Sequence, residues 1–166
     1  MTMLDRCIRF MESHSVCYSH SIHAPVGIAS QADDRGDIPP HGLTKSVVYM
    51  GDDGYGLAVV PADRAVDLHK LRQMLGLASL RIASETELEL LLPGSERGAL
   101  PPFGSLFGVP VFLDAELAAQ DSIAFRAGTS RDVIRISVVD FLRVVRPVVG
   151  NVVIGNRRNQ RALASC

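Results

Sequence analysis

The feature that most constrains the fold of this chain is a twelve-residue stretch with three glycines and three prolines, Pro93-Gly-Ser-Glu-Arg-Gly-Ala-Leu-Pro-Pro-Phe-Gly104. Proline fixes φ and lacks a backbone N–H group, whereas glycine adopts φ values that are closed to other residues. The stretch therefore predicts a loop that is stiff at Pro101 and Pro102 and permissive at its glycines. Its composition alone favours a surface turn. The alternative is a loop that holds its backbone close to a ligand.

Length and composition indicate a soluble protein with one domain. The 166 residues are enough to bury a sizeable core, and 47% of them are hydrophobic. With 17 basic and 18 acidic residues, a nucleic-acid partner would need a local basic face. The three cysteines are odd in number and lack metal-ligand spacing, which favours a reducing, cytoplasmic location. No apolar run resembles a signal peptide or a bilayer span, so we expect no membrane partner.

Helices and strands are predicted to alternate along one α+β domain at residues 1–150, followed by a partly disordered tail at 151–166. Residues 24–44 are rich in glycine and proline and predict a loop with one short helical turn near 28–33. The other predicted elements, in chain order, are a helix at about 3–14, strands at 16–22, 45–50 and 55–60, a helix from about 63 to 75, a strand at 80–83, a helix at 84–92, a strand at 109–113, a helix at 115–119, strands at 123–125 and 133–138, and a helix at 138–145.

Most of the motifs that identify catalytic or metal-binding sites are absent from the sequence. The sequence contains no phosphate-binding glycine loop, nucleophile elbow, Cys-X-X-Cys or His-Glu-X-X-His pattern, so we expect neither a metal nor another cofactor. The acidic groups Asp52-Asp53 and Glu85/Glu87/Glu89 are interpreted as solvated side chains in a turn and on a capped helix. Lys45 is the first residue of a predicted strand that is otherwise largely apolar. The simpler interpretation is that its ammonium group extends into the solvent at the end of the strand. These patterns alone do not identify a reaction.

Four blocks carry a family resemblance, and they occur in the family's order: Thr44-Lys45-Ser46-Val47-Val48, Val60-Pro-Ala-Asp63, Gly98-Ala-Leu-Pro-Pro-Phe-Gly104 and Phe125-Arg-Ala-Gly128. Over about residues 3–147 the chain resembles the YbaK/prolyl-tRNA synthetase-associated (INS-like) trans-editing domain family. The resemblance implies a mixed, mostly antiparallel β-barrel or curled sheet flanked by helices. It also implies an aminoacyl-tRNA deacylase that hydrolyses the ester of a mischarged tRNA without a metal or other cofactor. The implied partners are the acceptor end of aminoacyl-tRNA and an aminoacyl-tRNA synthetase.

The resemblance also implies which residues form the site, with Lys45 and the loop backbone in the catalytic role. The implied catalytic positions are Lys45, Gly98, Ala99 and Leu100, and the implied substrate-binding positions are His23, Ser46, Pro101, Pro102, Phe103, Gly104 and Gly128. We therefore expect Lys45 to lie beside the loop in a concave pocket. Residues 23–42 align poorly with the family, so alanine, cysteine, serine and proline all stay open as substrates, as does the oligomeric state. The alternative is a noncatalytic module of the same fold that binds a tRNA end or a protein.

Overall fold

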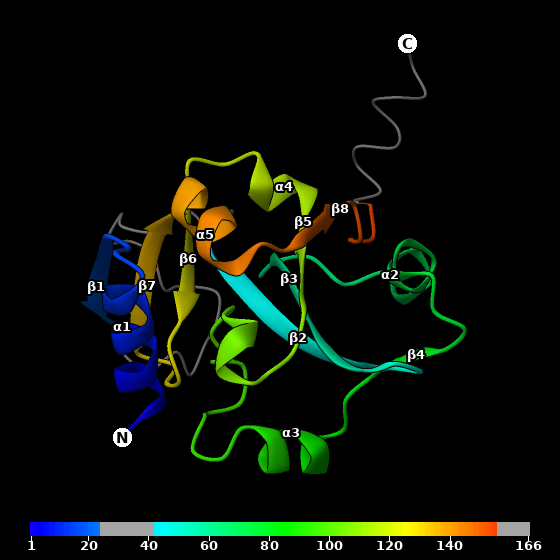
Figure 1. Ribbon diagram of the computed structural model, residues 1–166, viewed down its shortest axis with the longest axis horizontal. Helices are drawn as coiled ribbons and strands as arrows, with labels where there is room; N and C mark the ends of the chain where they lie inside the picture. Colours follow the sequence, from blue (N-terminus) through cyan, green and yellow to red (C-terminus); the bar gives the residue numbers. More distant parts are fainter. Residues whose placement is uncertain (24–41, 156–166) are drawn as a thin grey trace.

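The computed structural model describes residues 1–23 and 42–155 and has an α+β architecture (Figure 1), as predicted. The elements in chain order are α1 (Met3–Ser13), β1 (Tyr18–Ile22), β2 (Thr44–Gly51), β3 (Gly54–Pro61), α2 (Leu68–Leu75), β4 (Leu80–Ile82), α3 (Glu85–Leu91), the short 3-10 helix η1 (Gly104–Leu106), β5 (Val111–Asp114), α4 (Ala115–Ala118), β6 (Ser122–Arg126), β7 (Asp132–Ser137), α5 (Val138–Val145) and β8 (Val148–Gly150).

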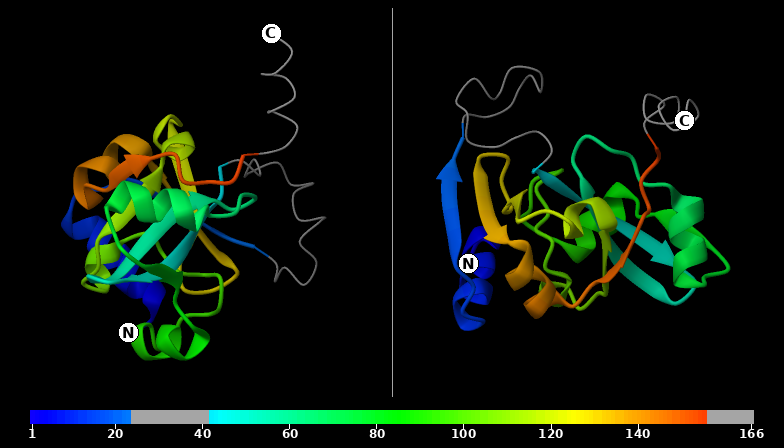
Figure 2. Two further views of the ribbon diagram at one scale, coloured as in Figure 1. Left: turned by 90° about the vertical axis from the view of Figure 1, so that its right-hand side faces the viewer. Right: turned by 90° about the horizontal axis from the view of Figure 1, so that it is seen from above.

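The strands form two sheets that lie side by side, with β1 at one end of the molecule and α2 at the other (Figures 1 and 2). The smaller sheet has the order β1-β7-β6 and is antiparallel throughout. The larger sheet has the order β4-β2-β3-β5-β8, in which β5 pairs in parallel with both neighbours. Neither of these sheets closes on itself. The strands therefore form open, mostly antiparallel sheets, and the barrel version of the prediction does not apply to them.

The start of β2 joins the two sheets. Leu43 forms a parallel bridge with Ala124 of β6, and the Thr44 hydroxyl donates a buried hydrogen bond of 3.1 Å to the Ala124 carbonyl oxygen. The β2–β3 hairpin turns tightly, since Gly51 pairs with Gly54 and only two residues lie between them. This hairpin confirms the two strands predicted at residues 45–50 and 55–60. It also fixes the face of the sheet toward which each β2 side chain points.

The strand β3 contributes to hydrophobic clusters on both faces of the larger sheet. Leu57 and Val59 belong to the main core, whereas Ala58 and Val60 belong to a second cluster with Leu71 of α2. Successive side chains of a strand point to opposite faces, so this alternation is expected for a strand that is covered on both sides. The central strand β3 is therefore covered on both faces, whereas the edge strands β4 and β8 are largely exposed. One covering layer contains α1, β6 and β7, and the other contains α2.

Two segments differ from the sequence predictions. The helix expected from about residue 63 begins at Leu68, because the Asp67 side chain accepts a hydrogen bond from the Lys70 N–H group and caps the helix there. The sequence analysis did not predict β8, which pairs in parallel with β5. After β8, Val152 and Val153 are buried and belong to the second cluster. The helical turn predicted near 28–33 lies outside the described residues.

Candidate functional site

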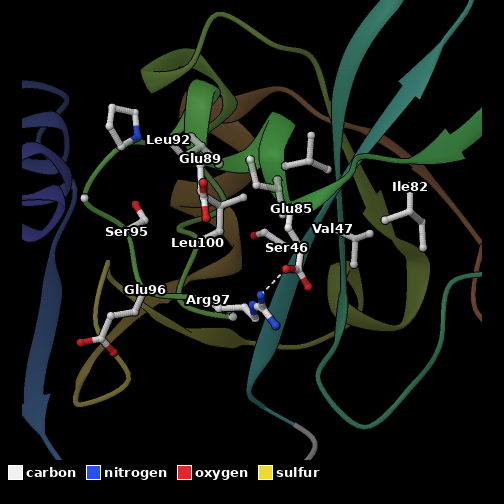
Figure 3. Close-up of a pocket in the computed structure, with 15 residues that line it drawn as sticks. Ser46, Val47, Ile82, Glu85, Glu89, Leu92, Ser95, Glu96, Arg97 and Leu100 are labelled. Atoms are coloured by element: carbon white, nitrogen blue, oxygen red, sulfur yellow. Dashed lines mark ion pairs between the residues drawn. The ribbon is translucent and has the colours of Figure 1, made fainter.

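A cavity of about 400 Å³ lies between β2, α3 and the loop that precedes η1 (Figure 3). One wall comes from β2 and Ile82 of β4, the second from one face of α3, and the third from the loop. The lining residues are Ser46, Val47, Val48, Ile82, Glu85, Leu88, Glu89, Leu92, Pro93, Gly94, Ser95, Glu96, Arg97, Gly98 and Leu100. This volume lies within the range typical of small-molecule sites, about 300–1,000 Å³.

The helix α3 presents one face to the cavity. Glu85, Leu88, Glu89 and Leu92 follow the i, i+3, i+4, i+7 spacing that places side chains on one side of a helix. The helix, predicted to be capped, begins with a capping box, in which the Ser84 hydroxyl accepts from the N–H group three residues later. The apolar members of this face form the back of the wall, and the two carboxylates lie nearer the solvent.

Glu87, on another side of α3, anchors the helix to the sheet. Its carboxylate accepts two hydrogen bonds from Arg81, at 2.7 and 2.8 Å, and one of 2.8 Å from the Tyr55 hydroxyl of β3. The hydrogen bonds from the Arg81 guanidinium are the largest of several effects that hold the pKa of Glu87 well below its ordinary value. This carboxylate therefore fixes the position of the helix wall relative to β3 and β4.

The loop is anchored in the core at its C-terminal end. Phe103 is fully buried, and its ring centroid lies 4.8 Å from that of Phe10, 5.2 Å from that of Phe125 and 6.2 Å from that of Phe141. The preceding Pro101 and Pro102 are also buried. A stiff proline pair next to a buried aromatic ring leaves this end of the loop little freedom to move. Phe103, predicted to bind substrate, is therefore placed in the core and is not part of the cavity lining.

Two serine hydroxyls in the cavity walls lack a hydrogen-bond partner among the described residues. The buried Oγ atoms of Ser46 and Ser95 have none, although both residues line the cavity. Figure 3 shows Ser46 projecting from β2 into the space between α3 and the loop. Buried polar atoms in proteins are nearly always paired with protein or with water, so unpaired ones need an explanation. A bound polar group or an ordered water in the cavity would supply the missing partner.

The ionisable side chains of the lining are three glutamates and one arginine. Arg97 of the loop pairs with Glu85 of α3 at 2.5 Å, and this ion pair joins two walls of the cavity (Figure 3). Both side chains are largely exposed, so the pair contributes little to stability. The Glu89 carboxylate lies on the same helix face, one turn away. The lining is acidic overall and therefore favours a cationic group over a phosphate.

Three of the predicted site residues meet in this cavity. Ser46, Gly98 and Leu100 line it, although about 50 residues lie between the strand and the loop in the sequence. Gly98 has a φ of +78°, the left-handed conformation that its residue type predicts. Among the backbone hydrogen bonds of the described residues, none comes from the N–H groups of Gly98 and Leu100.

Lys45 is not among the residues that line this cavity. It pairs with Val60 in the hairpin register, whereas Ser46 pairs with Val59. Since paired residues share a face of the sheet, Lys45 is directed to the face of the second cluster and Ser46 to that of the main core. Lys45 is half-buried and is the second residue of β2. Contact between its ammonium group and the loop stays a prediction.

The remaining predicted residues lie around the loop or away from it. The Ala99 N–H group donates to the Glu96 carbonyl oxygen at 3.1 Å, so it is already used within the loop. Gly104 is buried, Gly128 is hydrogen-bonded to the loop backbone, and neither lines the cavity. His23 directly follows β1, and its backbone N–H group donates to the Arg131 carbonyl oxygen at 2.8 Å, next to the smaller sheet.

Sequence reasoning missed the contribution of α3 to the cavity. Glu85 and Glu89 were interpreted only as solvated helix residues, and Arg97 was passed over within the loop. The four-residue spacing of the two glutamates on a helix that ends at the loop is the signal that places them together.

The described residues contain neither a candidate metal site nor a candidate membrane span. No group of three or more His, Cys, Asp or Glu side chains within residues 1–23 and 42–155 is arranged to hold a metal ion. In the same residues, no helix is both long enough and apolar enough to cross a bilayer.

Solved structures share this fold. The chain matches a candidate trans-editing enzyme for prolyl tRNA synthetase with a TM-score of 0.78 and 23% identity, over 93% of this chain and 99% of that one. A hypothetical protein also gives a TM-score of 0.78, with 16% identity over 90% of this chain and 99% of its own. At such low identities the likeness defines the class of fold.

The sequence match then defines the family. The aminoacyl-tRNA editing domain matches residues 23–144, and the chain therefore belongs to the aminoacyl-tRNA editing domain family. This confirms the resemblance drawn from the four sequence blocks. The proline–tRNA ligase of Xylella fastidiosa (strain M12) is 37% identical over 82 residues, and that of Xanthomonas oryzae pv. oryzae (strain MAFF 311018) is 40% identical over 86 residues. These segments cover 49% and 52% of this chain but only 14% and 15% of the ligases.

Proposed function

We propose that this protein hydrolyses the ester bond of tRNA mischarged with a small amino acid, in the cytoplasm and without a metal ion. The observation that carries the proposal is the cavity, which brings Ser46 of the lysine-containing block together with Gly98 and Leu100 of the glycine–proline loop. Both blocks fall inside the segment that matches the editing domain. The acceptor end of aminoacyl-tRNA is the proposed ligand, and a synthetase is the proposed source of the mischarged tRNA.

The chemistry requires positioning more than it requires a protein nucleophile. An aminoacyl ester is already activated toward water, so the enzyme has to orient the ester and stabilise the oxyanion that develops at its carbonyl oxygen. The N–H groups of Gly98 and Leu100 are the proposed donors to that oxygen, because neither makes a backbone hydrogen bond within the described chain. Lys45, the second residue of β2, is the proposed cation that orients the substrate.

The lining of the cavity is suited to the amino-acid part of the substrate. Its back wall is apolar, at Val48, Leu88 and Leu92, and its rim is acidic. An acidic rim would attract the α-ammonium group of an aminoacyl ester and repel phosphates. A synthetase pocket rejects a similar or smaller side chain by only about 1–3 kcal/mol, so a second site that selects by size improves fidelity. Alanine, cysteine, serine and proline are the proposed candidates.

One observation favours the noncatalytic alternative. Lys45 is absent from the cavity lining and is directed to the other face of the sheet. If its ammonium does not reach the ester, the chain would bind a tRNA end or a protein partner through the same cavity without hydrolysis. The two functions differ in whether binding is followed by release of the amino acid.

A deacylation assay decides between them. Alanyl-, cysteinyl-, seryl- and prolyl-tRNA are incubated with the wild-type protein, with and without a chelator. Hydrolysis of at least one of them above the spontaneous rate, unchanged by the chelator, is the expected result. Binding without hydrolysis of any would establish the noncatalytic alternative, and activity that disappears with the chelator would refute the metal-free mechanism.

A further inference from the structure

The backbone and side chain of Glu96 tie the loop to the turn between β6 and β7. Its N–H group donates to the Gly128 carbonyl oxygen at 2.9 Å, and its carboxylate Oε2 accepts from the Ser130 N–H group at 2.8 Å. Its carbonyl oxygen accepts from Ala99, whose own carbonyl oxygen accepts from Gly128 at 2.8 Å. Glu96 takes part in three of these hydrogen bonds, the fourth joins Gly128 to Ala99, and Gly98 lies between Glu96 and Ala99 in the segment that they close.

The turn to which Glu96 binds is itself fixed. The Thr129 hydroxyl donates to the Asp132 carboxylate at 2.6 Å and accepts from the N–H groups of residues 131 and 132. The other carboxylate oxygen of Asp132 bonds to His20 of β1 at 2.8 Å. Because this turn is held rigidly, the loop segment that is hydrogen-bonded to it is held in place as well. The Glu96 contacts therefore connect the loop to the smaller sheet.

We propose that Glu96 is a positioning residue, which holds the Gly98 and Leu100 N–H groups at the angle that the developing oxyanion needs. This inference rests on the proposed deacylase function. The Glu96 side chain is exposed, so its main effect is on the placement of the loop and not on burial in the core. The deciding contact is the hydrogen bond from the Ser130 N–H group to its carboxylate, because the three other bonds use only the backbone.

Two substitutions separate the hydrogen bond from the charge. Glu96→Gln keeps a side-chain oxygen that can accept from Ser130, whereas Glu96→Ala removes it. If the bond positions the loop, Glu96→Ala lowers kcat by about tenfold to a hundredfold with little change in KM, and Glu96→Gln retains most of the activity. If the carboxylate instead attracts the substrate, both variants raise KM to a similar extent, which would overturn the proposal. Glu12→Ala, on the exposed surface of α1, controls for the loss of a surface carboxylate.

Amide hydrogen exchange provides a readout that does not depend on turnover. In Glu96→Ala the amides of Ala99, Gly128 and Ser130 should exchange faster than in the wild type, and in Glu96→Gln and Glu12→Ala they should not. Unchanged exchange in Glu96→Ala would overturn the proposal whatever the activity. Faster exchange with full activity would overturn it as well. A wild-type protein without deacylase activity would refute the proposed function and the positioning role together, while exchange would still report whether Glu96 orders the loop.

Discussion

Gly98 offers a test of whether the loop backbone approaches the substrate. Its φ is +78°, and a Cβ atom built on it meets no described heavy atom within 4 Å. Gly98→Ala therefore adds a methyl group to open space in the free protein. The substitution lowers the stability only because a non-glycine residue has to adopt the left-handed backbone conformation. This loss of stability is about 1–2 kcal/mol. For a domain of this size it corresponds to a decrease in Tm of about 2–8 °C, which thermal unfolding would detect.

Activity should fall much further than this strain explains. If the ester lies against the Gly98 backbone, the added methyl group displaces it from the N–H donors, and loss of one such donor costs on the order of a hundredfold in rate. Gly108→Ala is the matched control, because Gly108 has a φ of +69°, has the same open space around its Cβ position and is not a lining residue.

The assay compares kcat/KM for deacylation and Tm for both variants. We expect similar decreases in Tm for the two, with a loss of activity of about a hundredfold in Gly98→Ala alone. Equal losses of activity in the two variants would mean that backbone strain explains the effect. Full activity in Gly98→Ala would remove this loop position from the site.

Three further predictions concern the supports of the cavity. Gly104→Ala should lower stability by about 1–3 kcal/mol in denaturant unfolding, since its Cβ would lie 2.3 Å from the Val109 carbonyl oxygen; unchanged stability would contradict this packing. The pKa of Glu87 is lower in the folded protein than its ordinary value of 4.5. The Glu87 carboxylate therefore contributes fully to stability above pH 4.5, and this contribution is lost progressively as the pH falls below 4.5. The difference in Tm between the wild type and Glu87→Gln should therefore shrink in acid, and a constant difference would refute the assignment. Arg97→Ala should leave Tm nearly unchanged, because its ion pair with Glu85 is exposed, but should change KM if the cavity holds the substrate; an unchanged KM would argue against that.

Local patterns predicted most of the fold. The strands predicted at residues 45–50 and 55–60 and the capped helix predicted at 84–92 rest on short-range signals, and each of these elements is present in the structure. The strand β8 was missed because three residues after Pro147 carry too little periodicity, and only its pairing with β5 reveals it. The predicted barrel came from the family resemblance, and strand closure depends on long-range pairing that no local pattern contains.

The site was predicted less completely than the fold. The family resemblance assigned Gly98 and Leu100 to the site, and both line the cavity. The side of the sheet toward which Lys45 points depends on the hairpin register, which the sequence did not determine. Glu96 was missed because its partner, Ser130, lies 34 residues away and donates through its backbone, which has no sequence signature.

We propose that this protein releases amino acids from mischarged tRNA with the help of Lys45. The most direct test of this proposal is the rate of deacylation by Lys45→Ala beside the wild type, on the most reactive of the four aminoacyl-tRNAs and with folding verified by Tm. We expect a clear wild-type rate above spontaneous hydrolysis and a decrease on the order of a hundredfold in the variant. A folded Lys45→Ala protein with the full wild-type rate would contradict the proposal.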